Sequence, residues 1–282
     1  MPQLSRMIKD YLFTAAVVVI AFIAILPILH IIVYVSSRGL PVVLEIGIVE
    51  FFTSMPAAVI AEKPGGIAPA LVGTLFMTAL ATVIAAPIAT LAAIFSVEFP
   101  SHPLARLVRV TSRSLLEVAT ILIGMLVFVL LVLPTGRFSA LAGSVALAIV
   151  MIPYVYTYVE LALMSVPRTY IEAAYAMGMK RAQVIILTLR IARRGVARGI
   201  GIAVTKAMGE TAPLLFTAGA ARNVIFAGPL EPIDALPLMI FHFIQTPFDN
   251  WRTLAWGGAF VLLVLYIALF ILVRISVKEV RY

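Results

Sequence analysis

Cysteine is absent from the 282 residues of this chain. The sequence therefore has no disulfide, no thiolate metal ligand and no cysteine nucleophile. Its three histidines are far apart, and a metal site needs clustered ligands, so we predict no metal centre. No grouping of serine, histidine and aspartate suggests nucleophilic catalysis. We therefore expect no catalytic residues in this chain and no enzyme activity of its own.

Charge is also scarce. Only 12% of the residues are Asp, Glu, Lys or Arg, and 63% are hydrophobic, whereas soluble domains have about 25% charged and about 45–50% apolar residues. A soluble globule cannot bury so much apolar surface, and a disordered chain would need low hydrophobicity and high net charge. The composition predicts an all-α, multi-pass membrane protein, because helices satisfy backbone hydrogen bonds within lipid.

Long apolar runs are abundant, and we read the whole chain, 1–282, as a single transmembrane domain. Six segments are long enough to span a bilayer as helices: 11–35, 69–97, 115–133, 139–164, 200–219 and 254–273. A further apolar stretch, 235–246, is too short to cross and predicts a helix lying at the membrane interface.

Basic residues divide unevenly between the two sides of this six-span arrangement. The two termini and the connections on their side hold fifteen Lys and Arg, and the opposite connections hold five. The positive-inside rule then places both termini in the cytoplasm and the chain in the cell (inner) membrane. Topology thus explains the net charge of +8, and no nucleic-acid partner is expected. A basic helix resting on anionic membrane lipid is predicted by four residues at helical spacing, His102, Arg106, Arg109 and Arg113.

The connection at 165–198 is cytoplasmic in this topology. Thr169 and Glu172 have the spacing of a capping box, in which each side chain bonds the backbone at the start of a helix. Gly178 has the position of a glycine that ends a helix, and a second short helix is predicted to start near Lys180. We expect two short helices joined by a glycine turn beneath the membrane.

This connection carries a recognisable motif. The run Glu172-Ala173-Ala174, followed after three residues by Gly178, resembles the EAA loop of ABC-importer permeases, which docks as a coupling helix into a groove of the cytoplasmic ATPase. The resemblance implies an ATPase-coupling role for these four residues. The chain has no G-x-x-x-x-G-K-[ST] run. ATP and Mg²⁺ are therefore expected on a separate ATPase chain, and no cofactor on this one.

Two ionisable residues, Lys206 and Glu210, lie inside the predicted fifth span. Four residues apart, they share one face of a helix. A charge at the bilayer centre costs ~2.5–3.5 kcal/mol, so such a pair must face protein or a water-filled path. We predict an ion pair there, acting either in a substrate pathway or as a contact between packed helices.

The residues around this pair are more specific. The nine residues 209–217, G-E-T-A-P-L-L-F-T, match without a gap the fifth-span signature of the A-type permease subunits (PstA) of phosphate-specific ABC importers, and the resemblance extends over about 65–260. It implies the type I importer permease fold and a subunit that forms half of a phosphate pathway, with Lys206, Glu210 and Thr211 in it. The partners that it implies are a homologous C-type permease subunit, two copies of a cytoplasmic ABC ATPase, and a periplasmic or tethered phosphate-binding protein.

Two departures from that family keep other substrates open. Lys206 stands where the family usually has Arg, and residues 117–124 read E-V-A-T-I-L-I-G where the family often has G-V-P-S-I-V-x-G. An ABC permease for another oxyanion, such as phosphonate, molybdate or sulfate, is therefore the alternative. An ion-coupled secondary transporter that uses Lys206 and Glu210 as a proton relay is a further reading, and the coupling loop disfavours it.

Overall fold

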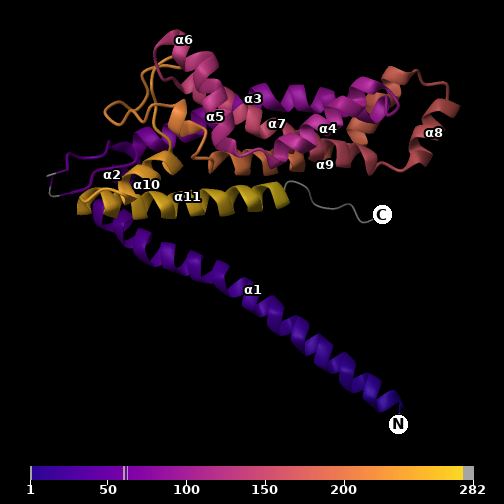
Figure 1. Cartoon of the computed structure of the whole chain (residues 1–282), viewed down its shortest axis with the longest axis horizontal. Coiled ribbons are helices and arrows are strands. Elements are labelled where there is room, and N and C mark those ends of the chain that lie inside the picture. Colours follow the sequence, from indigo (N-terminus) through magenta and orange to yellow (C-terminus); the bar gives the residue numbers. More distant parts are fainter. Residues whose placement is uncertain (1, 60, 62, 276–282) are drawn as a thin grey trace.

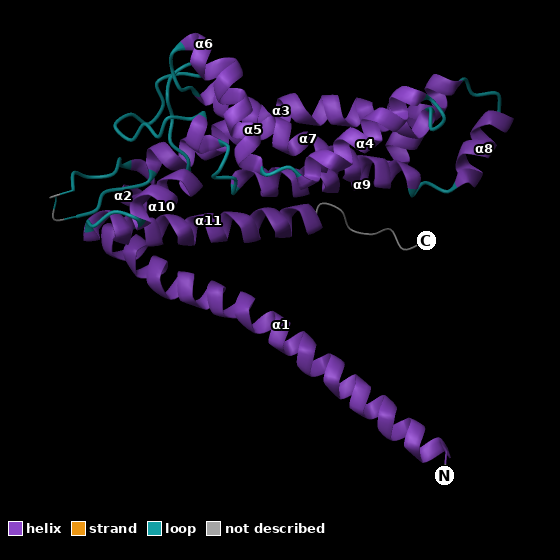
Figure 2. Ribbon diagram, in the orientation of Figure 1, coloured by secondary structure: helices purple, strands orange, loops and turns teal. Residues whose placement is uncertain are grey.

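The computed structural model describes residues 2–59, 61 and 63–275, and in these ranges it contains helices and loops but no β-strand, as predicted (Figures 1 and 2). Two tail residues counted with the cytoplasmic side, Lys278 and Arg281, lie outside the described residues. The elements are α1 (Pro2–Ile46), α2 (Ile48–Thr53), α3 (Ala68–Glu98), α4 (Pro103–Glu117), α5 (Thr120–Val127), a π-helical turn (Phe128–Val132), α6 (Leu133–Thr135), α7 (Ala140–Met164), α8 (Arg168–Ala176), α9 (Arg181–Met208), a 3₁₀ turn (Leu214–Phe216), α10 (Leu236–Ile244) and α11 (Asp249–Ile275).

The core is built by α3, α7 and α9, which pack along one another (Figure 1). Small side chains let helix backbones approach closely. In lipid the hydrophobic effect does not drive helices together, so close van der Waals packing of this kind holds them instead. α7 is the most enclosed helix of those that could span, with 67% of its most apolar window buried. The α3 side of the contact is a stripe of fully buried alanines at every fourth position, Ala81, Ala85, Ala89 and Ala93.

α1 is longer than the span predicted at 11–35 and continues as one helix of 45 residues through Pro27 and Pro41. It contacts α11 near its C-terminal end and diverges from the rest of the molecule toward its N-terminus (Figure 1). At the contact, a Cβ on Gly39 would lie 2.4 Å from the Trp256 carbonyl oxygen, so only glycine allows this approach. The apolar side chains of the diverging part are exposed, as expected for a helix in lipid or against another protein.

The predicted count of six spans is not confirmed. Hydropathy and length identify four helices that could cross a membrane, α1 from Asp10, α3, α7 and α11. A fifth is added if α4 and the segment from α5 to α6 count as one bent span. α9 is long enough at 28 residues. It carries several charged residues along its length, Arg190, Arg193, Arg194, Arg198 and Lys206, and so fails that test.

The third predicted span, 115–133, is wrong at its start. α4 and the segment from α5 to α6 meet at a bend of 106°. Val118 and Ala119 adopt extended ψ angles of 129° and 124°, which interrupts the helical hydrogen bonds. The new helix begins at Thr120, so the N-terminus of a helix lies inside the bundle.

The fifth predicted span, 200–219, is also wrong as a continuous helix. α9 ends at Met208, and the chain then turns through residues 209–213 into the 3₁₀ turn. Pro213 explains the end, because it has no amide hydrogen to donate and its ring would clash with the carbonyl of Gly209, four residues earlier. A proline within a membrane helix often produces only a kink, whereas here the helix stops.

The connection at 165–198 differs from its prediction in two ways. α8 starts at Arg168 and no side-chain hydrogen bond caps it, so the capping box predicted for Thr169 and Glu172 is wrong. The second helix is not short, because it is α9, which runs on into the core. The glycine turn is confirmed, since Gly178 has a φ of +79°, which L side chains rarely adopt.

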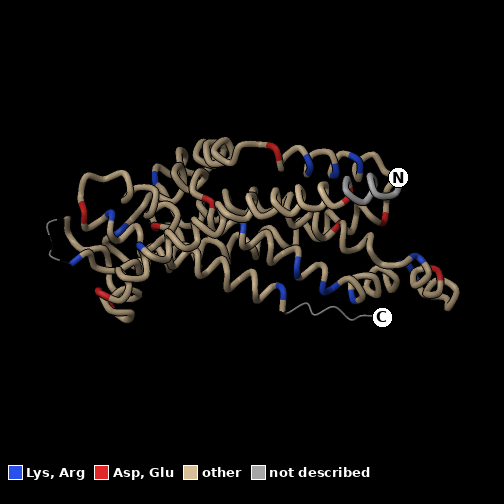
Figure 3. The backbone as a smooth tube through the Cα atoms, turned by 90° about the horizontal axis from the view of Figure 1, so that it is seen from below, with Lys and Arg blue, Asp and Glu red and all other residues tan. Residues whose placement is uncertain are grey.

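The two ends of the molecule have different contents. α8, the beginning of α1 and the end of α11 all lie toward one end (Figure 1). Figure 3 shows Lys and Arg positions gathered toward that same end. The short elements α2, α6 and α10 lie at the other end with the long loop that precedes α10. The side that carries both ends of the described chain is thus also the side of the basic connection.

The stretch predicted at 235–246 forms a short helix, α10. Its residues Leu236, Leu238, Met239 and Phe243 are at most 1% exposed, packed against α11 and α3. The other face is uncovered, with Phe241 and Ile244 each 42% exposed. One face of α10 thus belongs to the packed core at the end of the molecule opposite α8, and its placement at a membrane interface stays a prediction.

Candidate functional site

Two interrupted helices meet inside the bundle. The segment that follows the C-terminus of α9 lies against α5. A Cβ on Gly124 of α5 would fall 2.6 Å from the Cα and 2.9 Å from the carbonyl oxygen of Pro213, so the two backbones are in direct contact. Irregular backbone at membrane depth is tolerated where it is buried in protein or lines a cavity, and transporters build binding sites from such breaks.

The predicted ion pair lies at this junction. The Lys206 Nζ and the Glu210 Oε1 are 2.6 Å apart. They reach one another although α9 ends between them, because the turn after Met208 keeps the Glu210 amide bonded to the Ala207 carbonyl at 3.1 Å. The Glu210 side chain is 8% exposed and that of Lys206 is 48% exposed. The carboxylate is therefore fixed in the protein, while the ammonium is half open to its surroundings.

A second contact holds the carboxylate. The Thr120 hydroxyl, at the N-terminus of α5, donates a hydrogen bond of 3.1 Å to the Glu210 Oε2. The N-terminus of a helix carries partial positive charge and the C-terminus partial negative charge. Glu210 therefore lies at the favourable end of α5, and Lys206 lies in the last turn of α9, where a cation is favoured. Sequence reasoning missed Thr120, because the break that places it there is not visible in a run of apolar residues.

The third predicted site residue, Thr211, shapes the turn. Its carbonyl oxygen accepts hydrogen bonds from the amides of Leu214 and Leu215, which starts the 3₁₀ turn. Gly209 leaves room for the Tyr266 hydroxyl of α11, which would overlap a Cβ at that position. The signature residues thus build a compact turn against α5 and α11, with Lys206 beside it.

An open groove borders the pair. It lies between α9 and α11, has a volume of about 620 Å³, and includes Lys206, Gly209 and Tyr266 in its lining. The Lys206 ammonium therefore has the Glu210 carboxylate on one side and free volume on the other. A half-exposed ammonium with one fixed counter-ion can attract an anion without leaving a bare charge in the protein when the anion departs.

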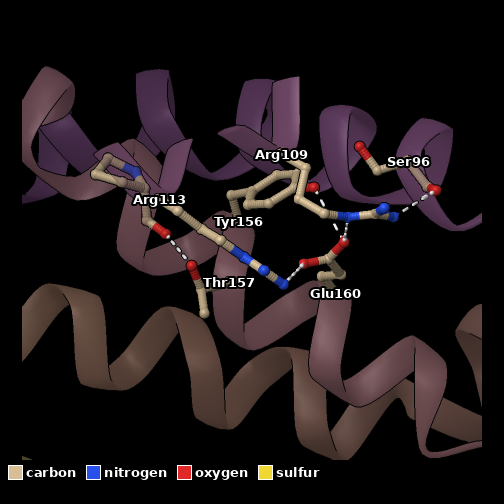
Figure 4. Close-up of polar contacts among 7 residues, drawn as sticks. Ser96, Arg109, Arg113, Tyr156, Thr157 and Glu160 are labelled. Atoms are coloured by element: carbon tan, nitrogen blue, oxygen red, sulfur yellow. Dashed lines mark hydrogen bonds and ion pairs between the residues drawn. The ribbon is translucent and has the colours of Figure 1, made fainter. Parts of the chain in front are cut away.

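A second polar centre lies between α3, α4 and α7 (Figure 4). The Arg109 Nε donates to the Glu160 Oε1 at 2.8 Å, and the Tyr156 hydroxyl donates to the same oxygen at 3.1 Å. Arg113 lies 3.8 Å from the other carboxylate oxygen, and the Arg109 Nη2 donates to the Ser96 carbonyl at 3.2 Å. Glu160 is 3% exposed. This arrangement has the full complement of partners expected of a structural ion pair.

The sequence alone assigns no partner to Glu160 and places Arg109 and Arg113 on lipid. An acid on the most buried helix is a signal that a partner is needed, but the partner is 51 residues away. The basic stripe of α4 is in fact divided. Arg109 turns inward to α7, while Arg106 remains exposed.

The four residues of the predicted coupling motif lie together on and after α8. Ala174 is fully buried, whereas Glu172, Ala173 and Gly178 are exposed. Among the described helices, α8 packs chiefly against α9. Its exposed surface is partly apolar, with large side chains of Tyr170, Tyr175 and Met177 that are 46–75% exposed. A projecting helix with an uncovered apolar surface is a candidate contact for another protein.

A charged contact also fixes the end of the molecule opposite α8. Asp234, just before α10, is 1% exposed, its Oδ1 accepts from the Ala235 amide at 2.8 Å, and the Arg222 Nε lies 3.5 Å from its Oδ2. The Arg222 guanidinium stacks over Phe243 at 4.8 Å from the ring centre. Burial raises the pKa of Asp234 to about 6. In the described part of the chain, no three His, Asp or Glu residues are grouped as metal ligands would be.

The chain is similar to known phosphate transport permeases. The chain is 44% identical to the "Probable phosphate transport system permease protein PstA" of Methanocaldococcus jannaschii over 275 residues, covering 97% of this chain and 95% of that protein. It is 35% identical to the "Phosphate transport system permease protein PstA" of Haemophilus influenzae over 241 residues, covering 85% and 83%.

The fold is also that of a solved transporter. An inward-facing structure of the MetNI methionine ABC transporter superposes with a TM-score of 0.58 at 18% identity, covering 73% of this chain and 94% of the matched chain. Residues 87–282 match the family described as "Binding-protein-dependent transport system inner membrane component". The chain belongs to this family, and it is therefore a membrane-embedded permease subunit of an ABC importer and not an enzyme.

Proposed function

We propose that this chain is the A-type permease subunit of an ATP-driven phosphate importer, with residues 1–282 forming one transmembrane domain. The half-exposed Lys206 ammonium carries the proposal, because it lies beside a fixed carboxylate at the meeting point of two interrupted helices. Relatives named as phosphate transport permeases at 35–44% identity support phosphate as the substrate.

In this proposal Lys206 is the substrate contact and Glu210 is its counter-ion. When no anion is present, the ammonium is neutralised by Glu210 at 2.6 Å. When phosphate enters, its oxygens accept from the exposed side of the ammonium, while Thr120 holds the carboxylate in place. Thr211 contributes by fixing the turn that follows the pair. No charge has to be buried or released alone at any stage, which keeps both states accessible.

The proposed partners follow from the subunit type. A homologous C-type permease would supply the other half of the pathway, and a periplasmic or tethered phosphate-binding protein would deliver the substrate. Two copies of a cytoplasmic ABC ATPase would bind ATP and Mg²⁺ and receive the coupling segment of Glu172, Ala173, Ala174 and Gly178. The exposed Tyr170, Tyr175 and Met177 of that segment support such docking.

A cell (inner) membrane location with both termini in the cytoplasm is part of the same proposal. The beginning of α1, the end of α11 and α8 lie toward one end of the molecule, and that arrangement supports a shared side (Figure 1). The basic residues near that end favour the cytoplasmic face.

Uptake by the reconstituted importer tests the substrate. Vesicles that contain the complete complex and internal ATP should accumulate radiolabelled phosphate, and excess unlabelled phosphate should compete. Molybdate, sulfate and phosphonate should compete weakly at the same concentration. Stronger competition by one of these anions would assign the chain to that oxyanion, and uptake without ATP would point to an ion-coupled transporter.

The coupling segment can be tested with a matched pair of glycines. Gly178 and Gly136 both have positive φ, at +79° and +67°, and at neither would an added Cβ have a heavy atom within 4 Å. Substituting Leu at either strains the backbone by about 1–2 kcal/mol. We expect Gly178→Leu to lower phosphate uptake at least tenfold while ATPase subunits remain bound, and Gly136→Leu to retain uptake. Equal activities of the two variants would contradict the assignment.

A further inference from the structure

The groove beside Lys206 extends well beyond the ion pair. All of its lining residues come from α9, the Gly209 that follows it, and α11, and it has a volume of about 620 Å³. It runs along α9 from Gly209 back to Arg198, which is eight residues from Lys206, or about 12 Å along the helix axis. α11 contributes Tyr266 at one end and Arg274 at the other.

The basic residues that line the groove are spread along its length. Lys206 lies at the end beside the helix break, and Arg198 and Arg274 lie toward the end that carries α8. No Asp or Glu is among the described residues that line the groove. Lys206 is neutralised by Glu210, and Arg274 brings a guanidinium to the outer part of the groove. An anion that leaves the Lys206 site meets positive charge in this direction.

We propose that this groove is the part of the phosphate pathway between Lys206 and the cytoplasm, and that Arg274 is the second residue of this chain to contact phosphate. The proposal rests on the proposed function and extends it from one site to a route. A guanidinium presents parallel N–H donors that match two phosphate oxygens, so Arg274 suits an exit contact that draws the anion from the single ammonium.

The walls of the groove offer a competing occupant. Ile202, Phe270 and Val273 make much of its surface apolar. An acyl chain of an anionic lipid could lie on these residues with its phosphate on Arg274. Both occupants would bring a phosphate group to the same guanidinium, and only one of them requires the groove to hold water.

A charge substitution gives the first test. In the complete importer, Arg274→Gln should lower phosphate uptake about tenfold, because it removes a charge-assisted contact to the anion, and Arg274→Lys should restore part of it. Arg252→Gln is the matched control, because Arg252 is on the same helix but lies outside the groove and pairs with Asp249. If wild type takes up phosphate and the two Gln variants are equally active, the route proposal is overturned and the proposed function stands. If wild type takes up another oxyanion in place of phosphate, the proposed function fails instead.

The absence of cysteine allows a second test that does not depend on uptake. Phe270 and Leu272 are 61% and 62% exposed on the same helix, but only Phe270 lines the groove. In the otherwise intact importer, we expect Phe270→Cys to react with a negatively charged thiosulfonate reagent and phosphate to slow the reaction, while Leu272→Cys stays unmodified. The modification is read as a mass increase of this chain.

The other outcomes of the cysteine test count against the route. No reaction at Phe270→Cys would mean that the groove is dry. Slowing by added anionic phospholipid, but not by inorganic phosphate, would assign the groove to a lipid. Either result overturns the proposal even if Arg274→Gln lowers uptake.

Discussion

Glu160 and Glu210 are both nearly inaccessible acids among packed helices, and both pair with a basic residue. Glu160 lies on the most enclosed helix, bonds Arg109 and Tyr156, and has Arg113 at 3.8 Å (Figure 4). All of these partners belong to continuous helices. Glu160 Oε1 accepts two hydrogen bonds, and Arg113 faces the other carboxylate oxygen.

Glu210 is held at the ends of two helices. Its partners are Lys206 in the last turn of α9 and Thr120 in the first turn of α5. The cation that directly bonds the acid is 48% exposed at Lys206 and 29% exposed at Arg109. Arg113 is 64% exposed but lies 3.8 Å from Glu160 and makes no hydrogen bond to it. The pair at Glu160 is therefore called the structural clamp, and the pair at Glu210 presents an accessible charge. The position of the partners along their helices and the exposure of the directly bonded cation separate the two.

The largest effect on stability is expected at the clamp. Glu160→Gln leaves Arg109 and Arg113 without their acid, and breaking a buried pair on one side costs about 3–5 kcal/mol. Because Arg109 is partly exposed, we expect about 2 kcal/mol, seen as a lower thermal unfolding midpoint and less assembled complex. The double change Arg109→Gln with Glu160→Gln should recover part of the loss. Glu117→Gln, at the exposed end of α4, is the control. A wild-type midpoint for Glu160→Gln would show that the clamp is not structural.

The largest effect on transport is expected at Lys206. Lys206→Gln should lower phosphate uptake at least tenfold at normal protein level, whereas Lys206→Arg keeps the charge and should retain uptake. The double change Lys206→Gln with Glu210→Gln removes both charges and should assemble well, because replacing a buried pair by neutral groups is often nearly neutral. It should still fail to transport. Recovery of uptake in that double variant would make the pair a packing contact like the clamp.

A smaller effect is expected at the hydroxyl that supports Glu210. Thr120→Val removes one hydrogen bond to a carboxylate, worth about 1 kcal/mol, and should lower uptake roughly fivefold. Thr82→Val serves as the matched control, because its hydroxyl bonds the Thr78 carbonyl within α3. We would measure uptake in vesicles at equal protein content. An effect of the same size in both variants would remove the special role of Thr120.

A third acid, Asp234, lies outside the spans, and its effect on stability is expected to depend on pH. The pKa of Asp234 is raised by burial from 3.8 to about 6, with Arg222 at 3.5 Å opposing the shift. The folded chain therefore holds this proton more tightly than the unfolded chain does. The resulting stability is full below about pH 4 and is lost as pH rises through about 6. Asp234→Asn should flatten this part of the dependence of the unfolding midpoint on pH, measured from about pH 4.5 to about pH 7. An unchanged slope would mean that another group sets it.

Much of the molecule was predictable because lipid imposes simple rules. Composition alone indicated a helical membrane protein, and the runs at 69–97, 139–164 and 254–273 correspond closely to α3, α7 and α11. The spacing of Lys206 and Glu210 predicted their ion pair, because four residues is one turn whether the helix continues or closes with a turn. The left-handed turn at Gly178 was also visible, since only glycine adopts it without strain.

The features that were missed depend on contacts between distant segments. Hydropathy does not distinguish a continuous span from one that stops, so the ends at Met208 and Thr120 were read as helix. The partner of Glu160 comes from another helix, and one face of α10 is buried because α3 and α11 cover it.

The sequence by itself determined that the chain is a helical membrane protein, which residues pair within one turn, and where a glycine is required. Those properties follow from local geometry and from the cost of exposing polar groups to lipid. Only the tertiary structure decided which of the two acid–base pairs is enclosed and which borders a groove through its base, Lys206. That distinction depends on which helix ends meet, and the meeting of α5 with the end of α9 joins residues 90 positions apart in the chain.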